Sequence, residues 1–183
     1  MGDKGDATQE ITTASRYVYR GRILNLRVDT VRLPDGHTTE REIVEHRGAV
    51  GIVPLDGAGN VTLVRQYRKP IERAILEIPA GTLDPGEDPA TCLHRELREE
   101  TGLSAGKVQH LATYYSAVGF CTEEMHVYLA TDLQRGQPGP DEDEFVEVVP
   151  LPLVTALRMV ERGEIVDAKT IIGLLAVKAR GLA

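Results

Sequence analysis

The sequence has few of the residues that build disulfide, zinc or membrane structures. Only two cysteines occur among its 183 residues, Cys92 and Cys121, and their spacing indicates neither a zinc site nor a disulfide framework. No apolar run approaches the length of a membrane span, and the first residues, MGDKGDATQEITTAS, lack the apolar centre of a signal peptide. We therefore expect a cytoplasmic protein without a membrane partner.

Positive charge is also in the minority. The chain carries 21 lysines and arginines against 28 acidic residues, a formal net charge of −7, and no basic run offsets this excess. Nucleic acid is therefore not expected as a partner, because its phosphates repel an acidic surface. A small phosphate-containing substrate remains compatible with the acidity, since metal ions can bridge phosphates and carboxylates.

The chain divides into three regions. Residues 1–14 are polar and contain glycine, which predicts a disordered tail. Residues 15–46 show the alternation typical of strands and predict a small N-terminal β-sheet subregion. Residues 47–183 mix strands and helices without an internal repeat, which predicts one α/β domain with helices on the faces of its sheet. Strands are expected at 49–55, 61–68, 75–79, 108–116, 125–131 and 145–151, and helices at 153–163 and 167–180.

A further helix is predicted within residues 81–103. Asp88 is a suitable N-cap, Pro89 suits the first helical position, and Gly102 suits a left-handed residue after the last turn. Apolar residues recur along one stripe of this helix and can pack against a core. The stretch therefore has both the capping residues and the periodicity of a helix that docks on a domain.

Acidic side chains line the edge beside this apolar stripe. At about 100° per residue, Glu96 and Glu100 lie about 40° apart on the helix, with Glu99 beside them. Such carboxylates repel one another unless cations neutralise them, and Mg²⁺ prefers oxygen ligands of this kind. A bound metal ion would polarise a phosphoryl oxygen and lower the pKa of a water nucleophile. The alternative is a solvated helix whose acids have no ligand.

The spacing of the whole stretch decides between these interpretations. Nine positions fit one pattern, and average amino-acid frequencies give such a match by chance about once in 10^10 starts. The pattern resembles the Nudix box without a mismatch, through Gly81, Glu87, Arg95, Glu96, Leu97, Glu99, Glu100, Gly102 and Leu103.

The resemblance implies a Nudix α/β/α sandwich with a mixed sheet, and hydrolysis of nucleoside diphosphates linked to another moiety. The implied cofactor is Mg²⁺, with Mn²⁺ or another divalent metal as alternatives. Glu96 and Glu100 would be metal ligands, with Glu99 in or beside the same shell. Arg95 would brace the acidic cluster, and Ala80 would offer its backbone carbonyl to a metal.

Beyond the box, the chain from Tyr17 to its end is similar to the ADP-ribose pyrophosphatase subfamily, in segments such as REIVEHRGAVGIVPL (41–55) and GFCTEEMHVYLA (119–130). In that subfamily the N-terminal strands help to build a homodimer in which both subunits contribute to each site. A homodimer through residues 15–46 is therefore implied. The implied substrate-binding residues are Arg41 and Glu42 at the adenine end, Arg68 on phosphate, Glu123 on the terminal ribose, and His46 and Gly119 in matching segments. For Arg68 the alternative is an ordinary surface cation.

One position departs from the subfamily. Its ADP-ribose-specific members typically carry a proline sixteen residues after the last glycine of the box, where this chain has Val118. Without the proline this loop is less rigid. Activity on a broader range of nucleoside diphosphate sugars is therefore an alternative to specificity for ADP-ribose.

The acidic segment PDEDE, residues 140–144, has two interpretations. A run of this kind is commonly a solvated loop. In the subfamily, however, the equivalent loop carries the general base and a further metal ligand, which align here with Glu142 and Glu144. A slip of one residue in this alignment would exchange them for Asp141 or Asp143.

We therefore expect a Mg²⁺-dependent hydrolase that converts ADP-ribose to AMP and ribose 5-phosphate. Its expected catalytic residues are Glu142, Glu99 and Arg95. One alternative is a broader nucleoside-diphosphate-sugar pyrophosphatase. Another is a non-catalytic module that binds ADP-ribose, although such modules commonly lack a box carboxylate and this chain keeps all of them.

Overall fold

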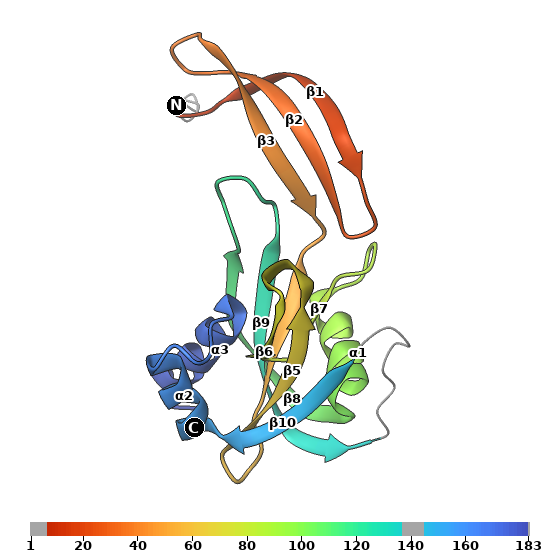
Figure 1. Cartoon of the computed structure of the whole chain (residues 1–183), viewed down its shortest axis with the longest axis vertical. Coiled ribbons are helices and arrows are strands. Elements are labelled where there is room, and N and C mark those ends of the chain that lie inside the picture. The colour runs from red at the N-terminus through yellow and green to blue at the C-terminus, as the bar shows by residue number, and fades with distance from the viewer. Residues whose placement is uncertain (1–6, 137–144, 183) are drawn as a thin grey trace, which may run out of the picture. The chain divides into compact units, whose positions relative to one another are not determined.

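The computed structural model describes residues 7–136 and 145–182, which fall into two compact units (Figure 1). The first unit holds the chain up to Arg47 together with Tyr115–Glu124. The second unit holds Gly48–Tyr114 and the chain from Met125 onwards. The sequence placed a boundary between residues 46 and 47, but it did not predict that residues 115–124 belong with the N-terminal strands.

The first unit contains an antiparallel sheet of order β1-β2-β3, formed by β1 (Ile11–Arg20), β2 (Leu24–Arg32) and β3 (Thr38–His46). Strand β1 begins inside the region expected to be a disordered tail, because residues 11–14 pair with residues 30–32 of β2. Isoleucine and threonine favour extended backbone, and the Thr13 hydroxyl donates to the Thr30 carbonyl at 3.1 Å. The expectation of disorder for residues 1–14 is therefore corrected for residues 11–14.

Residues 115–124 join the first unit through hydrogen bonds to β3. The Val44 N–H donates to the Phe120 carbonyl at 2.7 Å, and the Thr122 N–H donates to the Val44 carbonyl at 3.0 Å. The Thr122 hydroxyl also accepts the His46 N–H at 2.9 Å. Tertiary pairing of this kind, between segments about 76 residues apart, leaves no periodic signal in the sequence.

The second unit is built from two sheets, of order β10-β5-β6 and β7-β4-β9-β8, in the part of the chain that is described. Strand β4 runs parallel to β9 and antiparallel to β7, so this sheet is mixed, as predicted. A 3-10 turn, η1 (Lys69–Ile71), follows β5. The strands are β4 (Ala49–Pro54), β5 (Asn60–Arg68), β6 (Arg73–Glu77), β7 (Ala80–Thr82), β8 (Leu103–Tyr115), β9 (Glu124–Arg135) and β10 (Val146–Pro152), and the helices are α1 (Pro89–Thr101), α2 (Leu153–Glu161) and α3 (Ala168–Ala179).

Within the second unit, α1 lies on one side of the strands and α2 and α3 lie on the other (Figure 1). All six residues of β4 are buried, as its continuous apolar run predicted. Val50 and Ile52 pack in one hydrophobic cluster with α1, whereas Ala49 and Val53 pack in the other cluster with α2 and α3. Alternate residues of one strand thus face opposite helix layers, and the predicted α/β/α sandwich is confirmed.

The helices themselves are short. The 13-residue α1 falls well below the roughly 20 residues that a span requires. Across residues 7–136 and 145–182, no helix is long and apolar enough to cross a membrane.

Candidate active site

Helix α1 carries the acidic stretch, and its ends are those that the sequence predicted. The Asp88 carboxylate accepts the N–H groups of Ala90 at 3.0 Å and Thr91 at 3.1 Å, and Pro89 takes the first helical position. At the other end, Gly102 has a φ of 67° and donates its N–H to the Arg98 carbonyl. The apolar side packs on β4, which leaves the carboxylates at the edge of the buried face.

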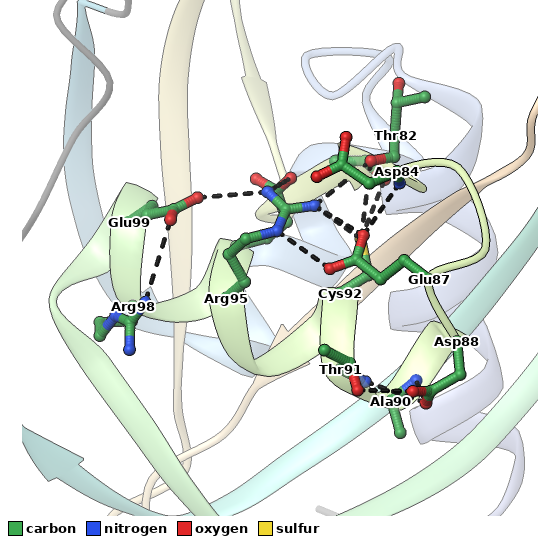
Figure 2. A network of polar contacts seen from close by, with 12 residues as sticks. Thr82, Asp84, Glu87, Asp88, Ala90, Thr91, Cys92, Arg95, Arg98 and Glu99 are labelled. Carbon is green, nitrogen blue, oxygen red and sulfur yellow. Dashed lines mark hydrogen bonds and ion pairs between the residues drawn. The ribbon is translucent and has the colours of Figure 1, made fainter.

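Arg95 lies among three carboxylates, those of Glu96 and Glu99 on α1 and that of Glu87 before the helix. Figure 2 shows Arg95 between Glu87 and Glu99. Its Nη1 donates to Glu96 Oε1 at 2.6 Å and to Glu99 Oε2 at 3.2 Å. Its Nε and Nη2 donate to the two oxygens of Glu87 at 3.1 and 3.0 Å. The role implied for Arg95, a brace for the acidic cluster, is compatible with this geometry.

The ion pair between Arg95 and Glu87 favours the charged form of both residues. Hydrogen bonding from Arg95 lowers the pKa of Glu87 to about 2, and hydrogen bonding to Glu87 raises the pKa of Arg95. Burial raises the pKa of the neighbouring Cys92 thiol to about 12, so Cys92 stays protonated at neutral pH and is not a nucleophile. The chemistry of this edge therefore rests on its carboxylates.

The backbone at the start of the box, Ala80 and Gly81, contacts the carboxylates of Glu100 and Glu96. The Ala80 N–H donates to Glu100 Oε2 at 3.0 Å, and Glu100 is 7% exposed. A β-carbon on Gly81 would lie 1.8 Å from Glu96 Oε1, so only glycine leaves room for that carboxylate. Ala80, Glu96 and Glu100, the three metal ligands predicted within the described residues, are thus brought together.

The donor chemistry of this edge fits a divalent metal ion. Within the described residues, no three His, Cys, Asp or Glu side chains form a cluster that could hold an ion as they stand. Glu96 and Glu99 instead contact Arg95, which neutralises part of their charge. Carboxylate oxygens are the ligands that Mg²⁺ prefers, and the space beside Gly81 accommodates the Glu96 carboxylate. The residues present therefore fit the metal that the box implies.

Arg68, predicted to bind phosphate, lies at the end of β5 and is neither free nor an ordinary surface cation. Its Nε and Nη2 donate to the two carboxylate oxygens of Glu77 at 2.6 and 2.8 Å. Lys169 of α3 donates to the same carboxylate. Glu77 and Lys169 were not predicted as site residues, although a single acid inside the apolar strand ILEIP was an available signal.

The remaining predicted substrate-binding residues lie in the first unit. His46 Nδ1 is 3.6 Å from Glu123 Oε1, so these two are brought together. Arg41 instead pairs with Glu10, through hydrogen bonds of 2.6 and 3.0 Å. Glu42 is exposed on β3, opposite Val28 of β2.

The central residues of the loop 115–124 are exposed to solvent. Gly119 is exposed, and no atom of the described residues lies within 4 Å of the position that a β-carbon would take. Val118, which stands where the subfamily has proline, is 81% exposed. Glu142 and Glu144, the predicted base and further metal ligand, lie outside the described residues.

Comparison with known proteins identifies the family. Residues 45–171 match the family model described as the NUDIX domain, and residues 10–44 match the one described as the nucleoside diphosphate sugar hydrolase N-terminal domain. A crystal structure of an "ADP compounds hydrolase" superposes with a TM-score of 0.85 at 24% identity, covering 98% of this chain and 99% of that one. At this identity the likeness concerns the fold.

Three relatives are similar over most of their length. The ADP-ribose pyrophosphatase of Bacillus subtilis is 44% identical, over 88% of this chain and 89% of the relative. The methanol dehydrogenase activator of Bacillus methanolicus is 41% identical, over 93% of both chains. The ADP-ribose pyrophosphatase of Mycobacterium tuberculosis is 45% identical, over 92% of this chain and 83% of the relative. The chain therefore belongs to the Nudix family, as its box predicted.

Proposed function

We propose that this protein hydrolyses the diphosphate of ADP-ribose, giving AMP and ribose 5-phosphate. The observation that carries the proposal is the box geometry: Glu96 beside Gly81, and Glu100 on the Ala80 N–H. Two relatives at 44 and 45% identity are ADP-ribose pyrophosphatases, which supports this substrate class. The N-terminal match to a nucleoside diphosphate sugar hydrolase domain supports it further.

Glu96, Glu100 and the Ala80 carbonyl would hold a divalent ion, for which we propose Mg²⁺. When bound, Mg²⁺ supplies Lewis acidity and neutralises charge on the diphosphate. Arg95 holds the Glu96 and Glu99 carboxylates at the edge of α1 and neutralises part of their charge. The roles of Glu142 as base and Glu144 as ligand, and a cytoplasmic location, remain predictions from the sequence.

Arg68 would bind the diphosphate from the end of β5. A guanidinium matches two phosphate oxygens at once, which makes arginine suited to this task. We also keep the proposal that Arg41 and Glu42 act at the adenine end and Glu123 at the terminal ribose, with His46 and Gly119 beside them. The contact between His46 and Glu123 supports a shared role for that pair.

A homodimer is proposed through the N-terminal strands. All ten residues of β1 are exposed, and β1 is an edge strand of its sheet. Four of these residues are large and apolar, which is typical of a surface that meets a protein partner. They are Ile11, Tyr17, Val18 and Tyr19.

A broader nucleoside-diphosphate-sugar pyrophosphatase is the second candidate, and the exposed Val118 favours it. A substrate panel separates the two: ADP-ribose, ADP-glucose, GDP-mannose and diadenosine polyphosphates, each assayed with Mg²⁺. We expect kcat/KM for ADP-ribose to exceed the others by at least about tenfold. Similar values for several sugars would replace the first proposal with the second.

A non-catalytic ADP-ribose-binding module is the remaining alternative. The chain keeps every carboxylate of the box, which counts against this role. ADP-ribose that binds with Mg²⁺ and is recovered intact after long incubation would favour it.

A further inference from the structure

Glu77 is a buried carboxylate that binds two cations from different parts of the second unit. The residue is 1% exposed and lies at the end of β6. Arg68 of β5 contacts it with two hydrogen bonds, at 2.6 and 2.8 Å, and Lys169 of α3 donates to one of the same oxygens. Lys169 is itself nearly buried and also pairs with Asp167 at 3.0 Å.

Stability alone is a weak explanation for this buried charge. Burying an ion pair carries a large desolvation cost, and well-packed apolar residues often serve a core as well or better. The neighbours of Glu77 in the chain, Leu76 and Ile78, are buried apolar residues of that kind. An acid at position 77 therefore points to a task that an apolar side chain cannot perform.

The hydrogen bonds to Glu77 leave one nitrogen of the Arg68 guanidinium, Nη1, for another ligand. They use Nε and Nη2, and no hydrogen bond from Nη1 occurs within the described residues. The Arg68 side chain is 39% exposed. The hydrogen bond to Glu77 raises the pKa of Arg68, with a smaller contribution from Glu100, so the guanidinium stays charged.

The backbone around Glu77 is continuous with the box. Three residues after Glu77, the Ala80 N–H donates to the Glu100 carboxylate at 3.0 Å. Between Glu77 and Ala80, the Ile78 N–H donates to the hydroxyl of Thr170 at 2.8 Å. Thr170 lies in the first turn of α3. One short segment thus fixes both the carboxylate that holds Arg68 and a carboxylate of the box.

We propose that Glu77 is a positioning residue for the substrate diphosphate. It orients Arg68 so that Nη1 of the guanidinium meets the phosphates beside the box. Lys169 supplies the second cation, so the buried carboxylate stays neutralised while Arg68 also binds an anion. This inference rests on the proposed function, and it assigns Glu77 and Lys169 a role in substrate recognition.

The first test measures kcat and KM for ADP-ribose in the Glu77→Gln variant. Glutamine keeps the size of the side chain but loses the charge and one of the two acceptor oxygens. We expect KM to rise about tenfold or more, with a smaller change in kcat, because a charge-assisted pair that fixes Arg68 is lost. If this variant does not fold, Glu77→Asp carries the same test, since it keeps the charge and withdraws the carboxylate by one methylene.

A double-mutant cycle separates positioning from a purely structural role. The Arg68→Met variant leaves Glu77 paired with Lys169, and it should show the same rise in KM. In the Arg68→Met background, Glu77→Gln should add little, because no guanidinium remains to be oriented. The control is Arg65→Met, which removes an exposed arginine of the same strand that pairs with Glu147. It should leave KM unchanged.

Binding of ADP keeps this inference separate from the proposed function, because ADP offers a diphosphate without requiring cleavage. We expect calorimetric titration with ADP to give a Kd about tenfold weaker for Glu77→Gln than for the wild type. Equal Kd values, no binding to either protein, or multiplicative losses in the double mutant would each overturn the role of Glu77. A wild type that binds ADP but leaves ADP-ribose intact would overturn only the proposed function.

Discussion

The carboxylate of Glu96 fills the space that a side chain at position 81 would need. A β-carbon at position 81 would lie 1.8 Å from Oε1 of Glu96 and 1.9 Å from its carboxyl carbon. The first residue of the box is therefore a glycine because a carboxylate fills the volume that any side chain would need. This contact explains why glycine stands fifteen positions before Glu96 in the box.

Gly81→Ala should therefore displace the Glu96 carboxylate while the helix that carries it still forms. We expect kcat for ADP-ribose to fall at least about tenfold, since a misplaced catalytic group costs this much or more. Steady-state kinetics with Mg²⁺, alongside circular dichroism, measures both effects. Gly57→Ala is the matched control, because no atom in the described part of the chain lies within 4 Å of its β-carbon position. Unchanged kinetics in both variants would contradict the steric account.

Asp88 should contribute to stability rather than to chemistry. Its carboxylate accepts the N–H groups of Ala90 and Thr91 at the start of α1. We expect Asp88→Ala to lower the free energy of unfolding, and Asp88→Asn, which keeps an acceptor, to lower it by less. Urea unfolding followed by circular dichroism compares them. Equal losses in the two variants would show that the cap is not responsible.

Glu87 should make the stability of the metal-free protein depend on acid pH. Arg95 lowers the pKa of Glu87 from 4.5 to about 2 in the folded state. Because the folded-state pKa is the lower one, the pair stabilises the fold above about pH 4.5, and this contribution is lost as pH falls toward 2. Glu87→Gln should therefore be less stable than the wild type at pH 7, with the difference shrinking through that window.

The measurement is urea unfolding at several pH values with a chelator present. Glu40→Gln provides the control, since the Glu40 side chain is 60% exposed and pairs with Arg16 only at 3.8 Å. Its stability difference from the wild type should stay small across the same range. A difference for Glu87→Gln that does not vary with pH would contradict the assignment.

The exposed apolar residues of β1 should control assembly. We expect the wild type to have a solution mass of twice the 20.0 kDa chain. Val18→Asp, at a position that is 54% exposed, should shift the protein toward the monomer, because it places a charge in an apolar interface. Light scattering coupled to size exclusion measures both. A monomeric wild type would remove the dimer proposal.

Local signals in the sequence predicted much of the second unit. Asp88 and Gly102 mark the ends of α1 as expected, and the apolar run of β4 is buried on both faces. These features succeed because capping and burial depend on neighbours within a few residues. The spacing of the box likewise brought Ala80, Glu96 and Glu100 together.

Contacts between distant segments were not predictable in the same way. Glu77, the partner of Arg68, is a single acid in an apolar strand of the sequence. Lys169, which also contacts Glu77, is 92 residues further along the chain. Residues 11–14 looked like a polar tail because their strand character depends on pairing with β2. Pairing and burial of this kind are set by tertiary structure, which periodicity does not encode.

The central claim is that the carboxylates of α1 carry out metal-dependent hydrolysis of ADP-ribose. Its most direct test compares wild-type protein with Glu96→Gln and Glu100→Gln, following AMP and ribose 5-phosphate formed from ADP-ribose with Mg²⁺. We predict equal amounts of the two products from the wild type. Both variants should stay folded, with turnover lower by about 100-fold or more. Near-normal turnover in both variants, or ADP-ribose recovered intact from the wild type, would contradict the account.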